Sequence, residues 1–549
     1  MTDQGPGGVD KGLEIQENAD QTSPARRLVA SSATVSVFNG LGVVAGFALD
    51  ALIAASFGVG TQTDAFFAAW RLPFLITVVF GMAASATLVP LFARGVAGGQ
   101  ESPLSETFSR IFNAVAILAA LLSGLGILLS PWLVSTLFAG LPAPGQALAA
   151  SLSQVLFLTV LFTGPVEVLR SLLYGHQIFA LPTAINFARS TTAIVVFMAG
   201  SLLFPSLTES DWSGLHLLAW GFLAGAVVQL LVVTWQARRH TSLQWQPLFD
   251  LRHPTLRRTA RLASAPTAGA LVRQSITLAE TAVASYLPPG SVTVLNYASR
   301  LTFVLSSVFL SSITTASMPV LSQDLAAGRR EKVRQTLLTA MRLVTLLAIP
   351  LGIGLAALGV PVIRLLFERG RFDEQASQLT GTVLSLYAVS ILFLGYFRVV
   401  QAYFYAAFKA GVVLILFIVL AVTTISLDIG LAGRIGVQGI AIGFTVGTLL
   451  TTILGLMLLW HEVYPDRSAD RDRQRLVSLL VLNAKVAIAS LLMALAALGV
   501  LRVLPDSSWA LLPALALGGL VFLASAWLLQ VQELGLAWDL IRQRGVRPE

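Results

Sequence analysis

The chain has 549 residues, of which 55% are hydrophobic and only 12% are charged. Repeated apolar segments of about 20 residues exclude a soluble protein and indicate an all-α integral membrane protein. The chain contains no cysteine, which excludes disulfides and thiolate metal sites, and its five histidines lack ligand spacing, so we expect no metal and no cofactor. The net charge of +8 is concentrated in short loops, which favours a membrane topology signal over nucleic-acid binding.

Apolar runs of spanning length predict about fourteen transmembrane helices. The predicted spans are 33–57, 66–93, 110–138, 147–173, 181–205, 214–236, 263–287, 293–321, 336–366, 378–406, 410–430, 435–460, 479–504 and 508–531. Residues 1–32 carry five acidic side chains and no apolar core, so they predict a disordered tail and not a signal peptide. The first helix is then an uncleaved anchor.

The loops alternate in charge along the chain. Arginine and lysine lie in the loops after the second, sixth, eighth and twelfth predicted helices, whereas the loops after the third, fifth and seventh contain neither. Short basic loops remain in the cytoplasm during membrane insertion. The pattern therefore predicts that both termini are cytoplasmic.

The chain also contains an internal duplication. When the stretch 50–99 is laid on the sequence 229 residues later, Arg71 falls on Arg300 and Pro90 falls on Pro319 without a gap. The two copies begin six helices apart, and an even number gives them the same orientation. The sequence therefore predicts two parallel six-helix repeats, related by an axis along the membrane normal.

The duplication divides the chain into units. We expect a disordered cytoplasmic tail at 1–32, an N-lobe at 33–237, a basic linker at 238–262, a C-lobe at 263–461, a cytoplasmic loop at 462–478, two further helices at 479–531 and a cytoplasmic tail at 532–549. The linker either lies on the anionic membrane surface or is a solvated connector. The last two helices stand outside the duplication, and we expect them to border a lipid-facing groove.

Several ionisable residues lie within or at the ends of the apolar helices, where a charge at the bilayer centre costs about 2.5 to 3.5 kcal/mol. Arg71 and Arg300 occupy equivalent places in the two copies, which favours a shared wet cavity that holds an anion. The alternatives are that each arginine reaches water at a membrane face or pairs with an acid. Glu167 and Arg398 match at an offset of 231 and are candidates to pair across the repeat axis. The candidate site residues are Asp50, Asp64, Arg71, Arg273, Glu280 and Arg300.

No motif in the chain predicts catalysis. There is no GxxxxGK[ST] loop, and HEVYP at 461 does not fit the HExxH zinc pattern. The acidic residues Glu368, Asp373 and Glu374 stand beside a helix end, which is more typical of a solvated turn than of a glycosidase pair. We therefore expect a protein that is not an enzyme.

Three motifs resemble one known family. They are GFALDALIAASFGVGTQTDAFFAAWRLP at 46–73, GSVTVLNYASRL at 290–301 and VIRLLFERGRFD at 362–373. Together they are similar to the MurJ/MviN lipid II flippases of the multidrug/oligosaccharidyl-lipid/polysaccharide exporter superfamily, over about residues 33 to 531. The resemblance implies a bacterial inner membrane protein with two lobes around a cationic cavity. It also implies a hydrophobic groove at the last two helices for a polyprenyl tail.

The resemblance extends to single positions. Asp50, Asp64, Arg71 and Arg300 keep the family's character, and Glu280 stands where members often carry an acidic residue or asparagine. Other positions depart from it: Val43, Leu49, Thr77 and Val78 stand where enterobacterial-type members carry arginine. Arg71, Arg273 and Arg300 are therefore expected to provide most of the phosphate recognition. Some members bind sodium through helices 7 and 11, and between 411 and 425 this chain offers only Thr423 and Thr424, which leaves sodium coupling open.

The combined expectation is a flippase that moves a polyprenyl-pyrophosphate-linked sugar, lipid II first among the candidates, from the inner to the outer leaflet by alternating access. The alternatives are an exporter of another lipid-linked glycan and a membrane scaffold that does not transport. The expected partners are the lipid-linked sugar and membrane lipids, and the expected state is a monomer. On this reading, Arg300→Ala abolishes transport without loss of the folded protein.

Overall fold

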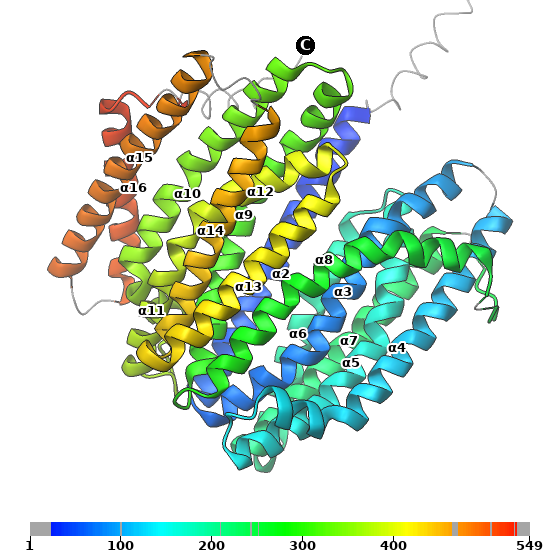
Figure 1. The fold of residues 1–549 in the computed structure, drawn as a ribbon. Coiled ribbons are helices and arrows are strands. Elements are labelled where there is room, and N and C mark those ends of the chain that lie inside the picture. Colours follow the sequence, from blue (N-terminus) through cyan, green and yellow to red (C-terminus); the bar gives the residue numbers. More distant parts are fainter. Residues whose placement is uncertain are drawn as a thin grey trace, which may run out of the picture.

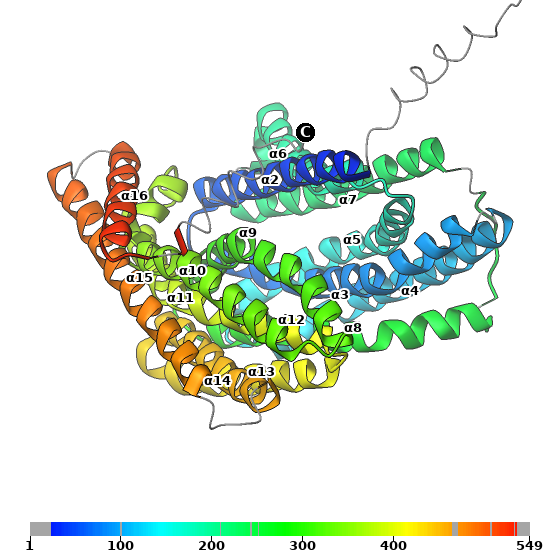
Figure 2. The ribbon, with the colours of Figure 1, turned by 90° about the horizontal axis from the view of Figure 1, so that it is seen from above.

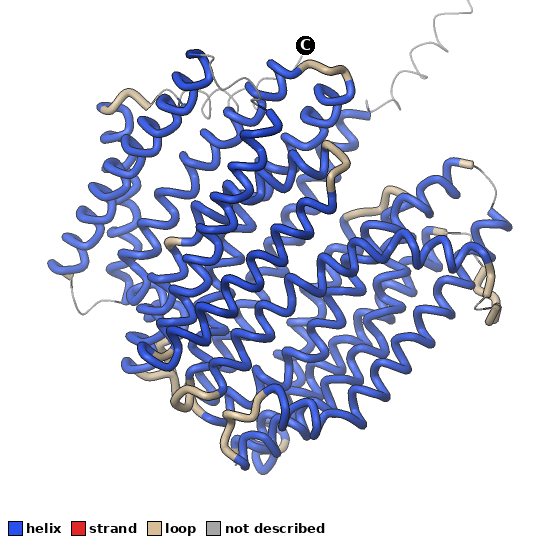
Figure 3. The backbone as a smooth tube through the Cα atoms, in the orientation of Figure 1, coloured by secondary structure: helices blue, strands red, loops and turns tan. Residues whose placement is uncertain are grey.

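The computed structural model describes residues 24–98, 101–208, 210–241, 244–250, 252–463, 470–504, 508–531 and 533–534, and within these ranges it is helical with no strand (Figure 3). The first half contains α2 (Pro24–Phe57), α3 (Thr61–Ala97), α4 (Glu101–Leu137), α5 (Ala143–Gly175), α6 (Ala180–Leu203) and α7 (Asp211–His240). The second half contains α8 (Pro254–Ser285), α9 (Ser291–Ala326), α10 (Arg330–Phe367), α11 (Glu374–Ala388), α12 (Ser390–Ala406), α13 (Ala410–Ile435) and α14 (Val437–Val463). The C-terminal pair is α15 (Asp470–Val503) and α16 (Leu511–Leu528).

The membrane-protein class is confirmed. In the described part of the chain, 13 segments are long and apolar enough to cross a membrane, with α11 and α12 counted as one segment that is broken at Val389. The predicted span 263–287 corresponds to α8, which does not reach that apolarity. Within that span α8 carries Arg273 and Glu280, each of which is costly in a bilayer.

Two predicted boundaries were wrong. The tail predicted over 1–32 overlaps α2, which begins at Pro24. Proline is favoured at the first helical position, and the following alanine, arginine and leucine are good helix formers, so the helix continues past the apolar run that marks the span. The loop predicted over 462–478 is also shorter, because α15 begins at Asp470. Residues 1–23 and most of the predicted C-terminal tail lie outside the described ranges.

The two halves form separate lobes that repeat one arrangement. In Figures 1 and 2, α3 to α7 form one lobe and α9 to α14 form the other. The duplication is also seen in the equivalent helices α3 and α9. Each carries a proline close to its C-terminal end, Pro90 in α3 and Pro319 in α9. α8 joins the lobes, since it contacts α3 on one side and α13 on the other.

The lobes diverge at one end and converge at the other (Figure 1). At the converging end the loop between α10 and α11 is held against the end of α2, where the backbone N–H of Arg371 donates to the carbonyl of Ala55 at 2.8 Å. Gly370 has a positive φ of 61°, and a Cβ there would lie 2.3 Å from the Ala55 oxygen. Only glycine permits this approach. Arg371 also pairs with Asp211 at the start of α7.

The linker between the lobes is fixed to the N-lobe. The side-chain amide of Asn113 on α4 donates to the carbonyls of Gln246 and Leu248, each at 3.0 Å, and its oxygen accepts from the indole N–H of Trp245 at 2.8 Å. The backbone N–H of Gln246 donates to Ser109. Buried polar groups of α4 thus hold this stretch against the N-lobe, while Trp245 and Phe249 stay exposed; the choice between a surface-lying segment and a solvated connector stays a prediction.

α15 and α16 pack against each other and on α10, on the flank of the C-lobe away from the N-lobe (Figure 2). Val486 and Ala489 of α15 are buried with Leu346 and Ile349 of α10. A small apolar cavity of about 130 Å³ lies there, bordered by α10, α12, α14 and α15. This cavity shares no lining residue with the cationic cavity described below. The lipid-facing groove at these helices stays a prediction.

Candidate functional site

Arg300 and Asp50 form an ion pair between the lobes. Arg300 on α9 donates from Nη1 to Oδ1 of Asp50 on α2 at 2.7 Å. Asp50 is 2% exposed, whereas the Arg300 side chain is 41% exposed. Gly46 lies one turn before Asp50, and a Cβ at this position would be 3.0 Å from an Arg300 nitrogen. The absence of a side chain at Gly46 gives the guanidinium room beside α2.

Arg71 on α3 reaches across to the two helices that open the second half. Its Nε donates to Thr281 Oγ1 on α8 at 3.1 Å, and its Nη2 donates to Asn296 Oδ1 on α9 at 3.1 Å. Both acceptors are neutral, so these bonds orient the guanidinium without neutralising it. Arg71 also interacts electrostatically with Glu280 and Arg300. Arg71 and Arg300, the equivalent arginines of the duplication, are therefore electrostatic neighbours between the lobes.

Arg273 lies in a polar cavity of about 600 Å³ on the inner side of the C-lobe. The cavity is bordered by α8, α9, α12, α13 and α14, and Arg398 also lines it. Gln274, Gln401 and Tyr405 add hydrogen-bonding groups, while Phe303 and Phe397 supply apolar walls. No acidic side chain is among the residues that line this cavity, so its character is cationic. Arg273 also contacts Met82 of α3, with Nη2 2.9 Å from Sδ.

Glu280 is buried beneath this region. It is 1% exposed and accepts a hydrogen bond from the Tyr387 hydroxyl at 3.2 Å. It interacts electrostatically with Asp428 of α13, which is fully buried. Both carboxylate oxygens of Asp428 and the hydroxyl of Thr424 lack a hydrogen-bond partner among the described residues. Two acidic residues and unsatisfied oxygens thus meet between α8 and α13.

Asp64 has a different surrounding from the other predicted site residues. It is 3% exposed and accepts from the backbone N–H groups of Gly290 at 2.6 Å and Thr293 at 2.8 Å. It also accepts from the Thr293 hydroxyl at 2.6 Å. These are free N–H groups at the start of α9, so Asp64 caps that helix from the opposite lobe. Asp64 therefore helps to close the converging end, and its contact with substrate stays a prediction.

Two expectations about pairing are settled. Glu167 does not pair with Arg398; it pairs with Arg170, one turn later on α5, at 3.0 Å. Residues at i and i+3 are neighbours on a helix, so this pair is local, whereas Arg398 lines the C-lobe cavity. Arg300 is paired with an acid, so Arg300→Ala leaves a buried carboxylate alone. The expectation that Arg300→Ala leaves the stability of the folded protein intact is therefore wrong, and we expect this substitution to destabilise it.

The structure adds three residues that sequence reasoning did not select. Arg189 on α6 has a buried Nε without a hydrogen-bond partner in the described part of the chain, and its guanidinium lies 5.9 Å from the centre of the Trp70 ring. Arg398 was noted as ionisable but not assigned to the site. Asp428 lies one turn beyond Thr424, just past the stretch where sodium ligands were sought. An acidic residue inside an otherwise apolar helix was the available signal.

A second cavity of about 710 Å³ lies in the N-lobe, between α3, α4, α5 and the first half of α8. Its lining is almost entirely apolar, for example Leu75, Phe80 and Leu118, with Glu167 and Arg257 as its charged members. It is thus unlike the C-lobe cavity, although both are bordered by α8.

Comparisons with known proteins agree with this architecture. The family model described as lipid II flippase MurJ matches residues 53–515. The lipid II flippase MurJ of Burkholderia cenocepacia is 27% identical over 428 residues, which cover 77% of this chain and 81% of that protein. A probable lipid II flippase MurJ of Bdellovibrio bacteriovorus is 29% identical over 409 residues, which cover 72% of this chain and 75% of that protein.

Solved structures give the same fold. A lipid II flippase MurJ in an inward closed conformation superimposes with a TM-score of 0.74 at 21% identity and covers 92% of this chain and 100% of its own. An inward-facing MATE family transporter of the MOP superfamily gives 0.66 at 15% identity, with 78% of this chain and 96% of its own covered. The motifs, the duplicated six-helix lobes and the family match over most of the sequence lead to one conclusion: the chain belongs to the lipid II flippase MurJ family.

Proposed function

We propose that the protein translocates lipid II, a polyprenyl-pyrophosphate-linked sugar, from the inner to the outer leaflet of a bacterial inner membrane. The observation that carries this proposal is the set of arginines from both lobes, Arg71, Arg273 and Arg300, at the junction of α3, α8 and α9. Guanidinium groups bind phosphate oxygens in pairs, and a charge in the membrane is stabilised when such an anion arrives. Family membership supports the choice of lipid.

The residues have separable roles in this proposal. Arg71, Arg273 and Arg300 face the phosphates, while Asp50 and Glu280 hold the neighbouring arginines in place. The two lobes then move relative to each other so that the central site opens first to the inner leaflet and then to the outer leaflet, as expected of parallel repeats around a central site. The protein needs no catalytic step, because the lipid crosses unchanged, and a monomer contains both lobes.

The direct test is transport by the purified protein. Proteoliposomes that contain defined lipid-linked sugars would be assayed for exposure of the sugar on the outer leaflet, together with complementation of a flippase-depleted strain. We expect lipid II to be moved and the strain to be rescued. Transport of only another lipid-linked glycan would favour an exporter of that glycan, and no transport with intact folding would favour a scaffold.

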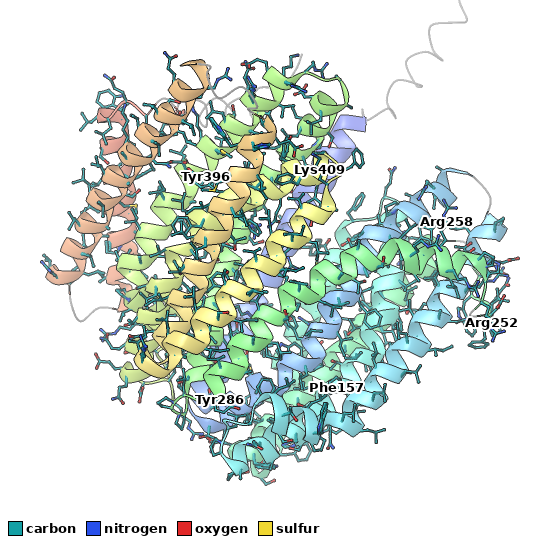
Figure 4. All side chains as sticks on the ribbon, in the orientation of Figure 1. Phe157, Arg252, Arg258, Tyr286, Tyr396 and Lys409 are labelled. Carbon is teal, nitrogen blue, oxygen red and sulfur yellow. The ribbon has the colours of Figure 1, made fainter. Side chains whose placement is uncertain are left out.

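Orientation is part of the proposal. The end where the lobes diverge carries Arg252, Arg258 and Lys409, whereas Tyr286 lies at the converging end (Figure 4). Basic residues mark the cytoplasmic side. The structure then represents a state that is closed toward the outside, with both termini in the cytoplasm.

Because the chain has no natural cysteine, single cysteines report this orientation without background. We expect a cysteine at the exposed Tyr286 to react with a membrane-impermeant maleimide in intact cells. A cysteine at the exposed Arg252 should react only after the membrane is permeabilised. The reverse labelling pattern would contradict the proposed topology.

The buried acids fit a cation site for energy coupling. The resemblance implies sodium in some members, and hard cations prefer oxygen ligands such as carboxylates and hydroxyls. The unsatisfied oxygens of Asp428 and Thr424, with Glu280 beside them, are a donor set of this kind. A bound sodium ion would offset one of the two negative charges of these carboxylates. Glu280, Thr424 and Asp428 would hold it.

Sodium should therefore stabilise the protein in the absence of any lipid. We expect NaCl to raise the thermal midpoint relative to an equal concentration of choline chloride, since a ligand of the folded state stabilises it. Asp428→Asn should remove most of this difference, whereas Asp373→Asn, at an N-cap of α11, should leave it unchanged. A sodium effect of equal size in Asp428→Asn would exclude this site.

A further inference from the structure

Arg189 is held in place on the N-lobe side of the interlobe region. Gly225 of α7 lies against it, and a Cβ at Gly225 would be 2.7 Å from the Arg189 carbonyl oxygen and 3.1 Å from its Cγ. The close approach of α6 and α7 thus fixes the base of the side chain. At its other end, the guanidinium lies beside the Trp70 ring, one residue before Arg71 on α3.

The charge of Arg189 is not neutralised by its neighbours. Its electrostatic neighbours are Arg300, Arg170 and Glu167. The only acid of these, Glu167, is already bound to Arg170 at 3.0 Å, and Arg300 is bound to Asp50 at 2.7 Å. The contact with Trp70 offsets only part of the cost of a desolvated cation. Arg189 therefore adds positive charge close to two further arginines, Arg170 and Arg300.

Asn186 completes the group. It lies one turn before Arg189 on α6, its side chain is exposed, and its oxygen accepts from Arg170 Nη2 at 3.4 Å. α5 and α6 therefore present two arginines and one amide toward the same region. Arginine and asparagine N–H groups are the donors that bind phosphate oxygens.

We propose that Arg189, together with Arg170 and Asn186, binds an anionic phosphate of the transported lipid from the N-lobe wall, apart from Arg71 and Arg300. This inference rests on the proposed function and deepens it. A pyrophosphate has two phosphates, so one cluster of donors can hold each of them. The N-lobe then recognises the head group through α5 and α6 as well as through α3.

The test compares two lipids that share the polyprenyl tail and differ in the pyrophosphate group. Binding of undecaprenyl pyrophosphate and of uncharged undecaprenol to the full chain in nanodiscs would be measured by native mass spectrometry. We expect Arg189→Gln to weaken binding of the pyrophosphate lipid by about tenfold or more, the range of one charge-assisted contact, and to leave undecaprenol binding unchanged. Arg189→Lys should retain part of the binding, because lysine keeps the charge but not the planar fork.

The matched control is Arg110→Gln. Arg110 on α4 also has an unsatisfied buried Nε and pairs with an acid on its own helix, Glu106 at 3.1 Å. Its loss should leave pyrophosphate binding at the wild-type level. Equal weakening by Arg110→Gln and Arg189→Gln, or unchanged binding in Arg189→Gln, would overturn the inference.

A second variant covers the case in which Arg189→Gln does not fold. Asn186→Asp places a carboxylate beside Arg170 at an exposed position, so it supplies an internal anion without opening the packing. We expect it to weaken pyrophosphate binding and to raise the thermal midpoint. Unchanged binding would contradict the inference. If Arg189→Gln weakens binding of undecaprenyl pyrophosphate but the wild type does not transport lipid II, the proposed function fails while the assignment of Arg189 as a phosphate-binding residue stands.

Discussion

Replacing Arg300 with alanine is expected to abolish transport and to destabilise the empty protein. The change removes a guanidinium that we propose to bind phosphate, and it leaves Asp50 buried with no ion-pair partner, since its Oδ2 has no hydrogen-bond partner among the described residues. Breaking one side of a fully buried ion pair costs about 3 to 5 kcal/mol, and because Arg300 is 41% exposed we expect a smaller loss here. Both effects are measurable, the first by leaflet exposure of lipid II in proteoliposomes and the second by the thermal midpoint in detergent.

The double variant Arg300→Ala with Asp50→Asn separates the two effects. Asparagine removes the unpaired charge, so stability should largely return while transport stays absent. Arg329→Ala with Asp324→Asn is the matched control, because that pair, at 2.8 Å, lies at the end of α9 and away from the site. Normal transport by the first double variant would show that Arg300 acts only as a structural partner of Asp50.

Replacing Asp64 with alanine should have the second large effect, a loss of stability with opening of the converging end. Alanine removes three hydrogen bonds to a buried carboxylate, from Gly290 and from the backbone and hydroxyl of Thr293. Bonds to charged groups contribute about 1.5 to 3 kcal/mol each, and even partial loss should exceed about 3 kcal/mol. Spin labels at Ser135 and Gln378, both exposed, would report the distance between the lobes.

Asp373→Ala is the control for this prediction, because Asp373 caps α11 within one lobe by accepting from the Ala376 N–H at 2.8 Å. It should cost about 1 kcal/mol, as expected for an ordinary helix cap, and leave the distance between labels unchanged. Equal effects of the two substitutions would mean that Asp64 acts as a local cap and not as a connection between lobes.

The helices, their approximate number and their duplication could be predicted from the sequence. They depend on the length of the apolar runs and on a repeat that aligns without gaps. The sequence also identified the charged residues, since a charge in an apolar helix is conspicuous. It did not identify their partners. Asp50 and Arg300 are 250 residues apart, and only the three-dimensional fold places their side chains 2.7 Å from each other.

Other contacts were missed for the same reason. Asp64 has the same sequence signature as a substrate ligand, and only the position of α9 makes it a cap. Glu167 and Arg398 match in the duplication, but equivalence in a repeat does not imply contact. The fixed linker depends on Asn113, an ordinary polar residue of α4 whose partners lie more than 130 positions away.

The composition of α8 also bears on how the protein enters the membrane during synthesis. α8 is the predicted span that is not apolar enough to cross the membrane alone. Insertion of a segment depends on its own transfer free energy from water to the bilayer. An arginine at the centre of a span makes this free energy less favourable by about 2.5 to 3.5 kcal/mol. The main contacts of α8 are α3, made earlier, and α13, made later. We therefore expect α8 to stay at the translocon until α13 emerges, so that the C-lobe inserts as a group, whereas the N-lobe helices insert one after another.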